Sequence, residues 1–156
     1  MKKVMRPRYY CEFCNKGGGS GGHMKTHESR CTKNPARKCN MCAVLLEQPQ
    51  PDLAMLITLL PTVETQMVIR HNTYGSNTYE DWLPVPLETV KVLREAAGGC
   101  PACMMAALRQ RGIPVPTAEG FDFTKESKEI LSNYNEAQRI ECVKCGYTAY
   151  EEDMWR

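Results

Sequence analysis

The chain has 156 residues, nine of them cysteine, and its formal net charge is only +2. Nine cysteines are too few for a small disulfide scaffold and many for a protein of a reducing compartment. The most apolar stretch, residues 53–60, is far too short to cross a bilayer, and the N-terminal sequence MKKVMRPRYY is not an apolar signal segment. We therefore expect a cytoplasmic protein without a membrane partner, in which paired cysteines bind metal.

Charge is distributed unevenly along the chain. Residues 1–42 contain ten Lys or Arg against two Glu, a net +8, whereas the remainder contains ten basic and sixteen acidic residues, a net −6. This asymmetry predicts a polyanionic partner for the basic part, although excess charge on a solvated face also serves solubility. Because the basic part also contains a metal motif, nucleic acid is the partner we favour.

Four metal-ligand side chains occur early in the chain at the spacing Cys-x2-Cys-x12-His-x3-Cys, formed by Cys11, Cys14, His27 and Cys31. Two thiolates in one turn can meet two ligands of a helix at a single point, since positions i and i+4 share a helix face. The spacing therefore predicts a zinc site. An alternative ligand set contains His23 in place of Cys31.

The same residues resemble the CCHH type of zinc finger, in its CCHC variant, over residues 9–31. Tyr9 falls where such fingers keep an aromatic residue, and Met24 falls at the aliphatic position of the helix. Gly18 stands where the family has phenylalanine, which is a departure from the pattern. The resemblance implies a ββα-like fold that depends on Zn²⁺, because so small a core cannot fold without the metal.

A glycine-rich run, GGGSGG at residues 17–22, spans the tip of the predicted finger. Each glycine inside a helix costs about 1 kcal/mol relative to alanine, so we expect the helix to begin late, near His23. In fingers that read DNA, helix positions −1, 3 and 6 contact successive bases, and here those are Ser20, His23 and Thr26. Only His23 could read a base edge, which favours weak, salt-sensitive binding through phosphates. The predicted nucleic-acid contacts are Lys16, His23, Lys25, Thr26, Arg30, Lys33, Arg37 and Lys38.

Beyond the finger, the apolar pattern predicts a small, mainly α-helical module. The expected elements are a helix opened by Pro51 and ended by Pro61, a short strand at 66–70, helices at 87–97 and 100–111, and a last helix with Thr124 as N-cap. Glycines at 98–99 and 112 end two of these helices. The predicted domains are a basic zinc finger at 1–35, a helical, zinc-stapled module at 36–145 and an acidic tail at 146–156.

Three Cys-x2-Cys pairs follow the finger: Cys39 with Cys42, Cys100 with Cys103, and Cys142 with Cys145. Each pair supplies half of a four-thiolate zinc site, so two pairs fill one site. The first two pairs lie at predicted helix starts, where the helix dipole favours thiolate, and we prefer them as partners. The main alternative is a zinc ribbon formed by the second and third pairs, because the third resembles a zinc-ribbon knuckle. We expect two Zn²⁺ sites, with the third pair as a candidate for another.

No nucleophile–base pair and no phosphate-binding loop occurs in the sequence, so we do not expect an enzyme. The segments NPARKCNMC at 34–42 and CPACMMAALRQRGIPVP at 100–116 resemble parts of uncharacterised bacteriophage and prophage zinc-finger proteins, which implies the cytoplasm of a bacterial host. The predicted function is nucleic-acid binding through the finger, with DNA favoured and a regulatory role. The alternatives are a protein-interaction adaptor for a host or phage protein, in which zinc is purely structural, and thiol–disulfide exchange at Cys100 and Cys103.

Overall fold

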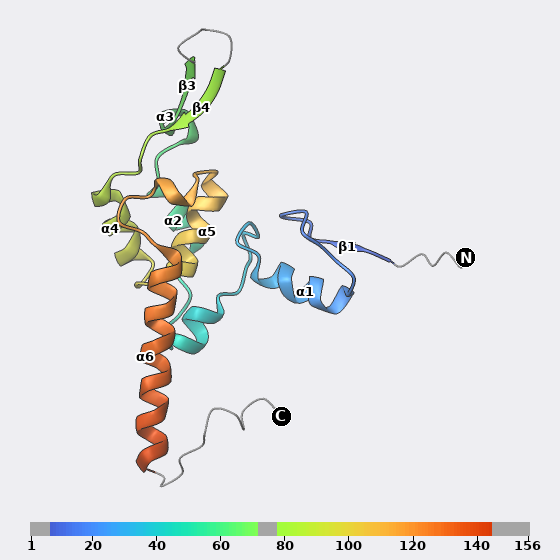
Figure 1. The fold of residues 1–156 in the computed structure, drawn as a ribbon, viewed down its shortest axis with the longest axis vertical. Coiled ribbons are helices and arrows are strands. Elements are labelled where there is room, and N and C mark those ends of the chain that lie inside the picture. The colour runs from blue at the N-terminus through green and yellow to red at the C-terminus, as the bar shows by residue number, and fades with distance from the viewer. Residues whose placement is uncertain (1–6, 72–77, 145–156) are drawn as a thin grey trace.

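A computed structural model describes residues 7–71 and 78–144, which form a mainly helical protein with two small sheets (Figure 1). In chain order the elements are β1 (Tyr9–Tyr10), β2 (Gly17–Gly18), α1 (Gly21–Arg30), the π-helical turn η1 (Met41–Leu45), α2 (Leu53–Thr58), α3 (Val63–Gln66), β3 (Met67–His71), β4 (Thr78–Trp82), α4 (Leu87–Ala96), α5 (Pro101–Arg111), the 3-10 turn η2 (Val115–Thr117) and α6 (Phe123–Lys144). In Figure 1, β1 and α1 lie to one side of the helical core, and α6 extends away from it. None of the helices in these two ranges combines the length and the apolar character needed to cross a membrane.

The N-terminal unit, residues 7–35, contains the β1–β2 hairpin followed by α1. The strands are antiparallel, with Tyr9 opposite Gly18 and Tyr10 opposite Gly17. α1 begins at Gly21, so the prediction of a late start near His23 is wrong. The Ser20 hydroxyl caps the helix by accepting the backbone N–H of His23 at 3.4 Å, and such a cap offsets much of the cost of two glycines in the first turn.

The helical core surrounds α5. Its largest fully buried side chains include Leu56 of α2, Leu93 of α4, and Met104 and Leu108 of α5 itself. Burial of a side chain of this size contributes about 1.5–3 kcal/mol. The cysteines Cys39, Cys42, Cys100 and Cys103 belong to the same buried cluster, whereas Cys11, Met24 and Cys31 form a separate small core in the N-terminal unit.

Two predicted helix starts are wrong, and in both an aspartate is the observed cap. α2 begins at Leu53, and Asp52 Oδ1 accepts the N–H of Ala54 at 3.0 Å, so Pro51 lies outside the helix. α6 begins at Phe123, and Asp122 Oδ1 accepts the N–H of Lys125 at 3.0 Å, so Thr124 lies inside it. Asp is a better N-cap than Thr, which explains the second difference.

The strand expected at 66–70 is observed as β3, one residue later, and it pairs with the unpredicted strand β4. The pairing is antiparallel, from Met67 opposite Trp82 to His71 opposite Thr78. β4 contains Glu80 and Asp81, residue types that are depleted in strands, so its sequence carries a weak strand signal. The hairpin extends from the helical core on the side opposite to α6 (Figure 1).

Gly112 ends α5 in the left-handed region, with φ of 84°. The N–H of Ile113 donates to Leu108 O at 2.9 Å, which closes the helix terminus. We expect Gly112→Ala to lower the free energy of unfolding by about 1–2 kcal/mol, because a side chain disfavours this φ. A Cβ would also lie 3.2 Å from Val63 Cγ2. Urea denaturation measures the loss. Gly19→Ala is the control, since a Cβ there meets nothing within 4 Å, and an equal loss in that variant would refute the explanation.

Candidate metal centres

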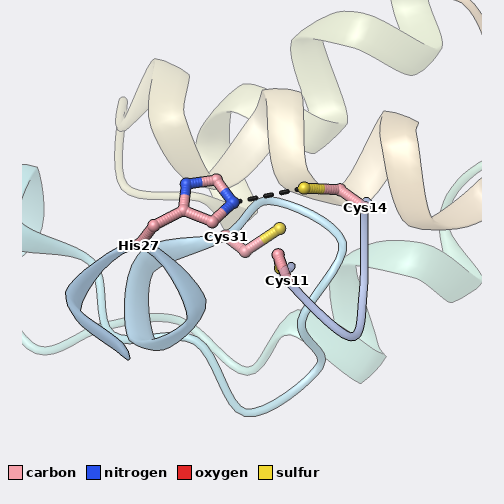
Figure 2. Close-up of side chains that lie close together, drawn as sticks. All are labelled: Cys11, Cys14, His27 and Cys31. Atoms are coloured by element: carbon pink, nitrogen blue, oxygen red, sulfur yellow. Dashed lines mark hydrogen bonds between the residues drawn. The ribbon is translucent and has the colours of Figure 1, made fainter. Parts of the chain in front are cut away.

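The first candidate centre, the N-terminal cluster, consists of Cys11, Cys14, His27 and Cys31. The two first cysteines lie in the turn that follows β1, His27 lies in the last turn of α1, and Cys31 is the C-cap of that helix. Their ligand atoms all lie within 4.8 Å of one another. Figure 2 shows the four side chains gathered together, with the Cys14 sulfur directed at the His27 ring.

The geometry of this cluster fits a tetrahedral zinc site. Cys14 Sγ lies 3.2 Å from His27 Nε2, and the corresponding edge of a zinc tetrahedron is about 3.5 Å for bonds of about 2.3 Å to sulfur and 2.0 Å to nitrogen. Cys11 and Cys31 are buried, and Cys14 is half-buried. The alternative ligand His23 is exposed and does not belong to the cluster.

The second candidate centre, the four-cysteine cluster, consists of Cys39, Cys42, Cys100 and Cys103. Cys39 precedes η1 and Cys42 lies within it, while Cys100 is the N-cap of α5 and Cys103 lies in its first turn. The distance between Sγ atoms is 3.7 Å for Cys39 and Cys100 and 3.6 Å for Cys42 and Cys103. A tetrahedron edge around zinc is about 3.8 Å, so the four sulfurs have the separation that one ion requires. All four side chains are at most 4% exposed.

Ionisation in the four-cysteine cluster is strongly coupled. A hydrogen bond from Cys100 lowers the pKa of the Cys39 thiol, whereas Cys103 has its pKa raised by the neighbouring Cys100 and Cys39 and by burial. One thiolate is thus stabilised by the remaining thiols, while further negative charge is opposed. A divalent cation supplies the positive charge that four thiolates in a buried site need.

In the N-terminal cluster the ionisation differs between its thiols. Hydrogen bonds from the backbone N–H of Lys16, which has the larger effect, and from His27 together lower the pKa of Cys14 to about 7. Burial raises the pKa of Cys31. Cys14 therefore becomes a thiolate more readily than Cys31, and thiolate is the form that binds metal.

Two glutamines, which sequence reasoning did not identify, support the four-cysteine cluster. Gln50 accepts the backbone N–H of Cys39 at 2.6 Å and donates to Arg37 O at 2.9 Å. Gln48 donates to Gly98 O at 3.0 Å and lies 4.0 Å from Cys42 Sγ. These bonds tie the loop after η1 to both cysteine pairs. The sequence EQPQP carries no motif that indicates this role.

Arg37 was predicted as a phosphate contact, and the structure contradicts this prediction. Its side chain is only 6% exposed. The guanidinium donates to Arg30 O at 3.5 Å, at the end of α1, and to Ala102 O at 3.4 Å, and it lies 3.8 Å from Cys103 Sγ. Arg37 therefore connects the N-terminal unit with the four-cysteine cluster.

The linker between the two clusters is also bonded to α5. Gln110 Nε2 donates to Thr32 O and to Asn34 O, both at 3.0 Å, and Arg109 donates to the Thr32 hydroxyl at 3.1 Å. The N-terminal unit is thus held against the helical core by hydrogen bonds to backbone carbonyls as well as by Arg37.

The other predicted nucleic-acid contacts lie on the surface of the N-terminal unit and its linker. The exposed residues are Lys16, His23, Lys25, Thr26, Arg30, Lys33 and Lys38. The Thr26 hydroxyl donates to Gly22 O at 3.1 Å, so it is already used within α1. The cationic side chains of this set are directed to solvent, where they can meet phosphates.

The third cysteine pair is only partly covered by the structure. The helical backbone of α6 runs to Lys144 and includes Cys142, which differs from the turn that a zinc-ribbon knuckle requires. The side chain of Cys142, the whole of Cys145 and the predicted acidic tail lie outside the described residues. Cys100 and Cys103, the partners required by the ribbon alternative, face Cys39 and Cys42 instead.

The fold and the two clusters define a small, mainly helical protein with Cys/His sites that are compatible with zinc. Comparison with family models, with curated proteins and with solved structures gave no match. What this chain does must therefore be inferred from its own residues.

Proposed function

We propose that the protein binds two Zn²⁺ ions, one in each cluster, and that both ions are structural. The convergence of four sulfur or imidazole ligand atoms to within 4.8 Å in each cluster carries this proposal. Structural zinc sites use four protein ligands of these types, whereas catalytic sites keep one position for water or substrate. The strand–strand–helix order of the N-terminal unit supports a site of the zinc-finger type there.

The proposed function of the N-terminal unit is nucleic-acid binding through phosphate contacts. Residues 1–42 carry a net +8, and Lys16, Lys25 and Lys33 are exposed. Cationic side chains on a small rigid unit give affinity for the phosphate backbone of a nucleic acid, and this affinity does not depend on its base sequence. A regulatory role would then depend on where along DNA or RNA the protein is recruited.

Salt dependence tests this proposal. Fluorescence anisotropy with a labelled oligonucleotide should show binding by the zinc-loaded protein that weakens steeply with salt and is lost after chelation. Lys33→Ala should reduce the slope of log affinity against log salt by about one, because one phosphate contact is removed. Lys91→Ala, which removes an exposed cation on α4 paired with Glu88, should leave the slope unchanged. Absence of binding at low salt would refute nucleic-acid recognition.

A second candidate function is that of a protein-interaction adaptor. A surface hollow between η1 and α6 is lined by Leu45, Leu46, Ile130 and Tyr134, with exposed Val44 and Leu131 on the same two elements. Exposed apolar side chains of this kind are typical of protein contacts. Retention of a protein partner by the wild type and its loss in Leu131→Ser would favour this function, provided that oligonucleotide binding is absent.

A further inference from the structure

Tyr10 is an exposed aromatic residue on β1. Its side chain is 60% exposed, although tyrosine usually buries most of its ring against a core. Tyr9, on the same strand, is 44% exposed, and Phe13 in the following turn is 38% exposed. The core of the N-terminal unit is instead formed by Met24 with Cys11 and Cys31. Its aromatic residues are therefore available on the surface.

Gly17 allows the Tyr10 ring to lie against the hairpin backbone. A Cβ at Gly17 would come within 2.9 Å of Tyr10 Cε1 and 3.2 Å of Tyr10 Cδ1, so the ring edge formed by these two atoms rests on this glycine. The same Cβ would lie 3.2 Å from Arg8 Nε, which places the guanidinium beside the ring. A supported aromatic ring next to an exposed cation forms one surface, which we call the Tyr10 platform (Arg8, Tyr10 and Gly17).

The side of α1 that would read a duplex offers few free polar groups. Ser20 Oγ accepts the N–H of His23 at 3.4 Å, and Thr26 Oγ1 donates to Gly22 O at 3.1 Å. Of the three positions that would face bases in the major groove, only His23 retains a side chain without such a bond to α1. Base-edge recognition by this helix is correspondingly weak.

We propose that the N-terminal unit binds single-stranded nucleic acid in preference to duplex, with an unpaired base stacked on Tyr10 and the adjacent phosphates bound by Arg8. This inference rests on the proposed nucleic-acid binding and names its substrate class. Stacking requires an exposed aromatic ring and is available only to bases that are not paired in a duplex. The neighbouring Arg8 guanidinium can bind the phosphates of the same strand. The positive charge of the unit favours a nucleic acid over an apolar protein surface as the occupant.

The test measures the affinity of the zinc-loaded full chain for an oligothymidine and for a duplex of equal length, by fluorescence anisotropy. We expect tighter binding of the single strand. Tyr10→Ala should weaken that binding at least about fivefold and leave duplex binding unchanged, because loss of a stacked base is a large part of single-strand affinity. Tyr10→Phe should retain it, since phenylalanine stacks equally. Gly17→Val should weaken it, because the added side chain displaces the ring.

Two controls separate stacking from other effects. Lys33→Ala should weaken single-strand and duplex binding by the same factor, because phosphates are present in both. Val92→Ala removes part of an exposed apolar side chain on α4 and should change neither. The absorption spectrum of the cobalt-substituted protein reports whether each variant keeps both metal sites.

The outcomes are distinguishable. Single-strand preference that is lost in Tyr10→Ala and kept in Tyr10→Phe supports the inference. Equal binding of both probes, or binding that is insensitive to Tyr10→Ala, overturns the single-strand inference while leaving phosphate-mediated binding intact. Absence of binding to either probe overturns both, and capture of a protein through Tyr10 would assign the platform to the adaptor function.

Discussion

Replacing Cys42 and Cys103 with serine is expected to reduce the zinc content by one ion per chain and to unfold the helical core. Both side chains are at most 1% exposed and lie in the buried cluster around α5. Zinc at structural sites contributes about 10–16 kcal/mol of apparent binding free energy, which is comparable with the whole stability of a typical domain, about 5–15 kcal/mol. Native mass spectrometry counts the zinc ions, and far-ultraviolet circular dichroism reports the loss of helix.

The matched control is the double variant Cys142→Ser with Cys145→Ser, which should retain the wild-type zinc content. Loss of one zinc in this control would instead favour the ribbon pairing. Where the Cys42 and Cys103 variant does not accumulate as a folded protein, graded chelation of the wild type gives the same information. Helix content should then fall in step with removal of a zinc ion, and helix content that is insensitive to complete zinc removal would contradict the prediction.

The ligand sets differ in how far the sequence determines them. In the N-terminal cluster, local spacing is sufficient, since a turn and one helix supply all four residues within a span that allows few arrangements. In the four-cysteine cluster, the paired thiols come from positions 61 residues apart. Three Cys-x2-Cys pairs permit several pairings, and the observed one depends on the tertiary fold that brings Cys39 and Cys42 to the first turn of α5, which spacing alone does not encode.

The differences between expectation and structure have local physical causes. The predicted helix starts at Pro51 and Thr124 were displaced by Asp52 and Asp122, whose carboxylates make the cap bonds. Glycines inside α1 were expected to delay the helix, but the Ser20 cap and the metal-ligand geometry at its other end permit an earlier start. Helix positions and glycine stops in α4 and α5 followed from apolar period and local turn chemistry, which the sequence expresses directly.

Arg37 shows why a charge pattern alone does not identify a ligand contact. It stands in the basic segment KNPARK, beside the exposed Lys33 and Lys38, and its sequence neighbourhood does not distinguish it from them. In its buried position the guanidinium bonds to the carbonyl of Ala102, 65 residues further along the chain, and lies beside Cys103 Sγ. Only the tertiary contact shows that this cation is structural.

Arg37→Met is therefore expected to weaken zinc binding at the four-cysteine cluster by about 10–100-fold, the range for loss of a group that supports metal ligands. Four thiolates around Zn²⁺ carry excess negative charge, and the guanidinium lies 3.8 Å from one of their sulfurs, Cys103 Sγ. Methionine has similar length without charge or donors, so it also leaves the carbonyls of Arg30 and Ala102 without this donor. Competition with a chromophoric chelator measures the zinc affinity.

Two comparisons make this prediction specific to the buried guanidinium. Lys38→Met removes a neighbouring cation that is exposed, and it should leave zinc affinity unchanged within about twofold, because solvent screens that charge. Arg37→Lys keeps the charge and loses the planar set of guanidinium donors, so its zinc affinity should fall between those of wild type and Arg37→Met.

Arg37 also bonds to Arg30 O at the end of α1, so Arg37→Met should loosen the N-terminal unit. Amide hydrogen exchange at residues 28–31 should then become faster. Equal zinc affinity in Arg37→Met and Lys38→Met would show that the guanidinium does not stabilise the cluster, and unchanged exchange would show that it does not join the two units.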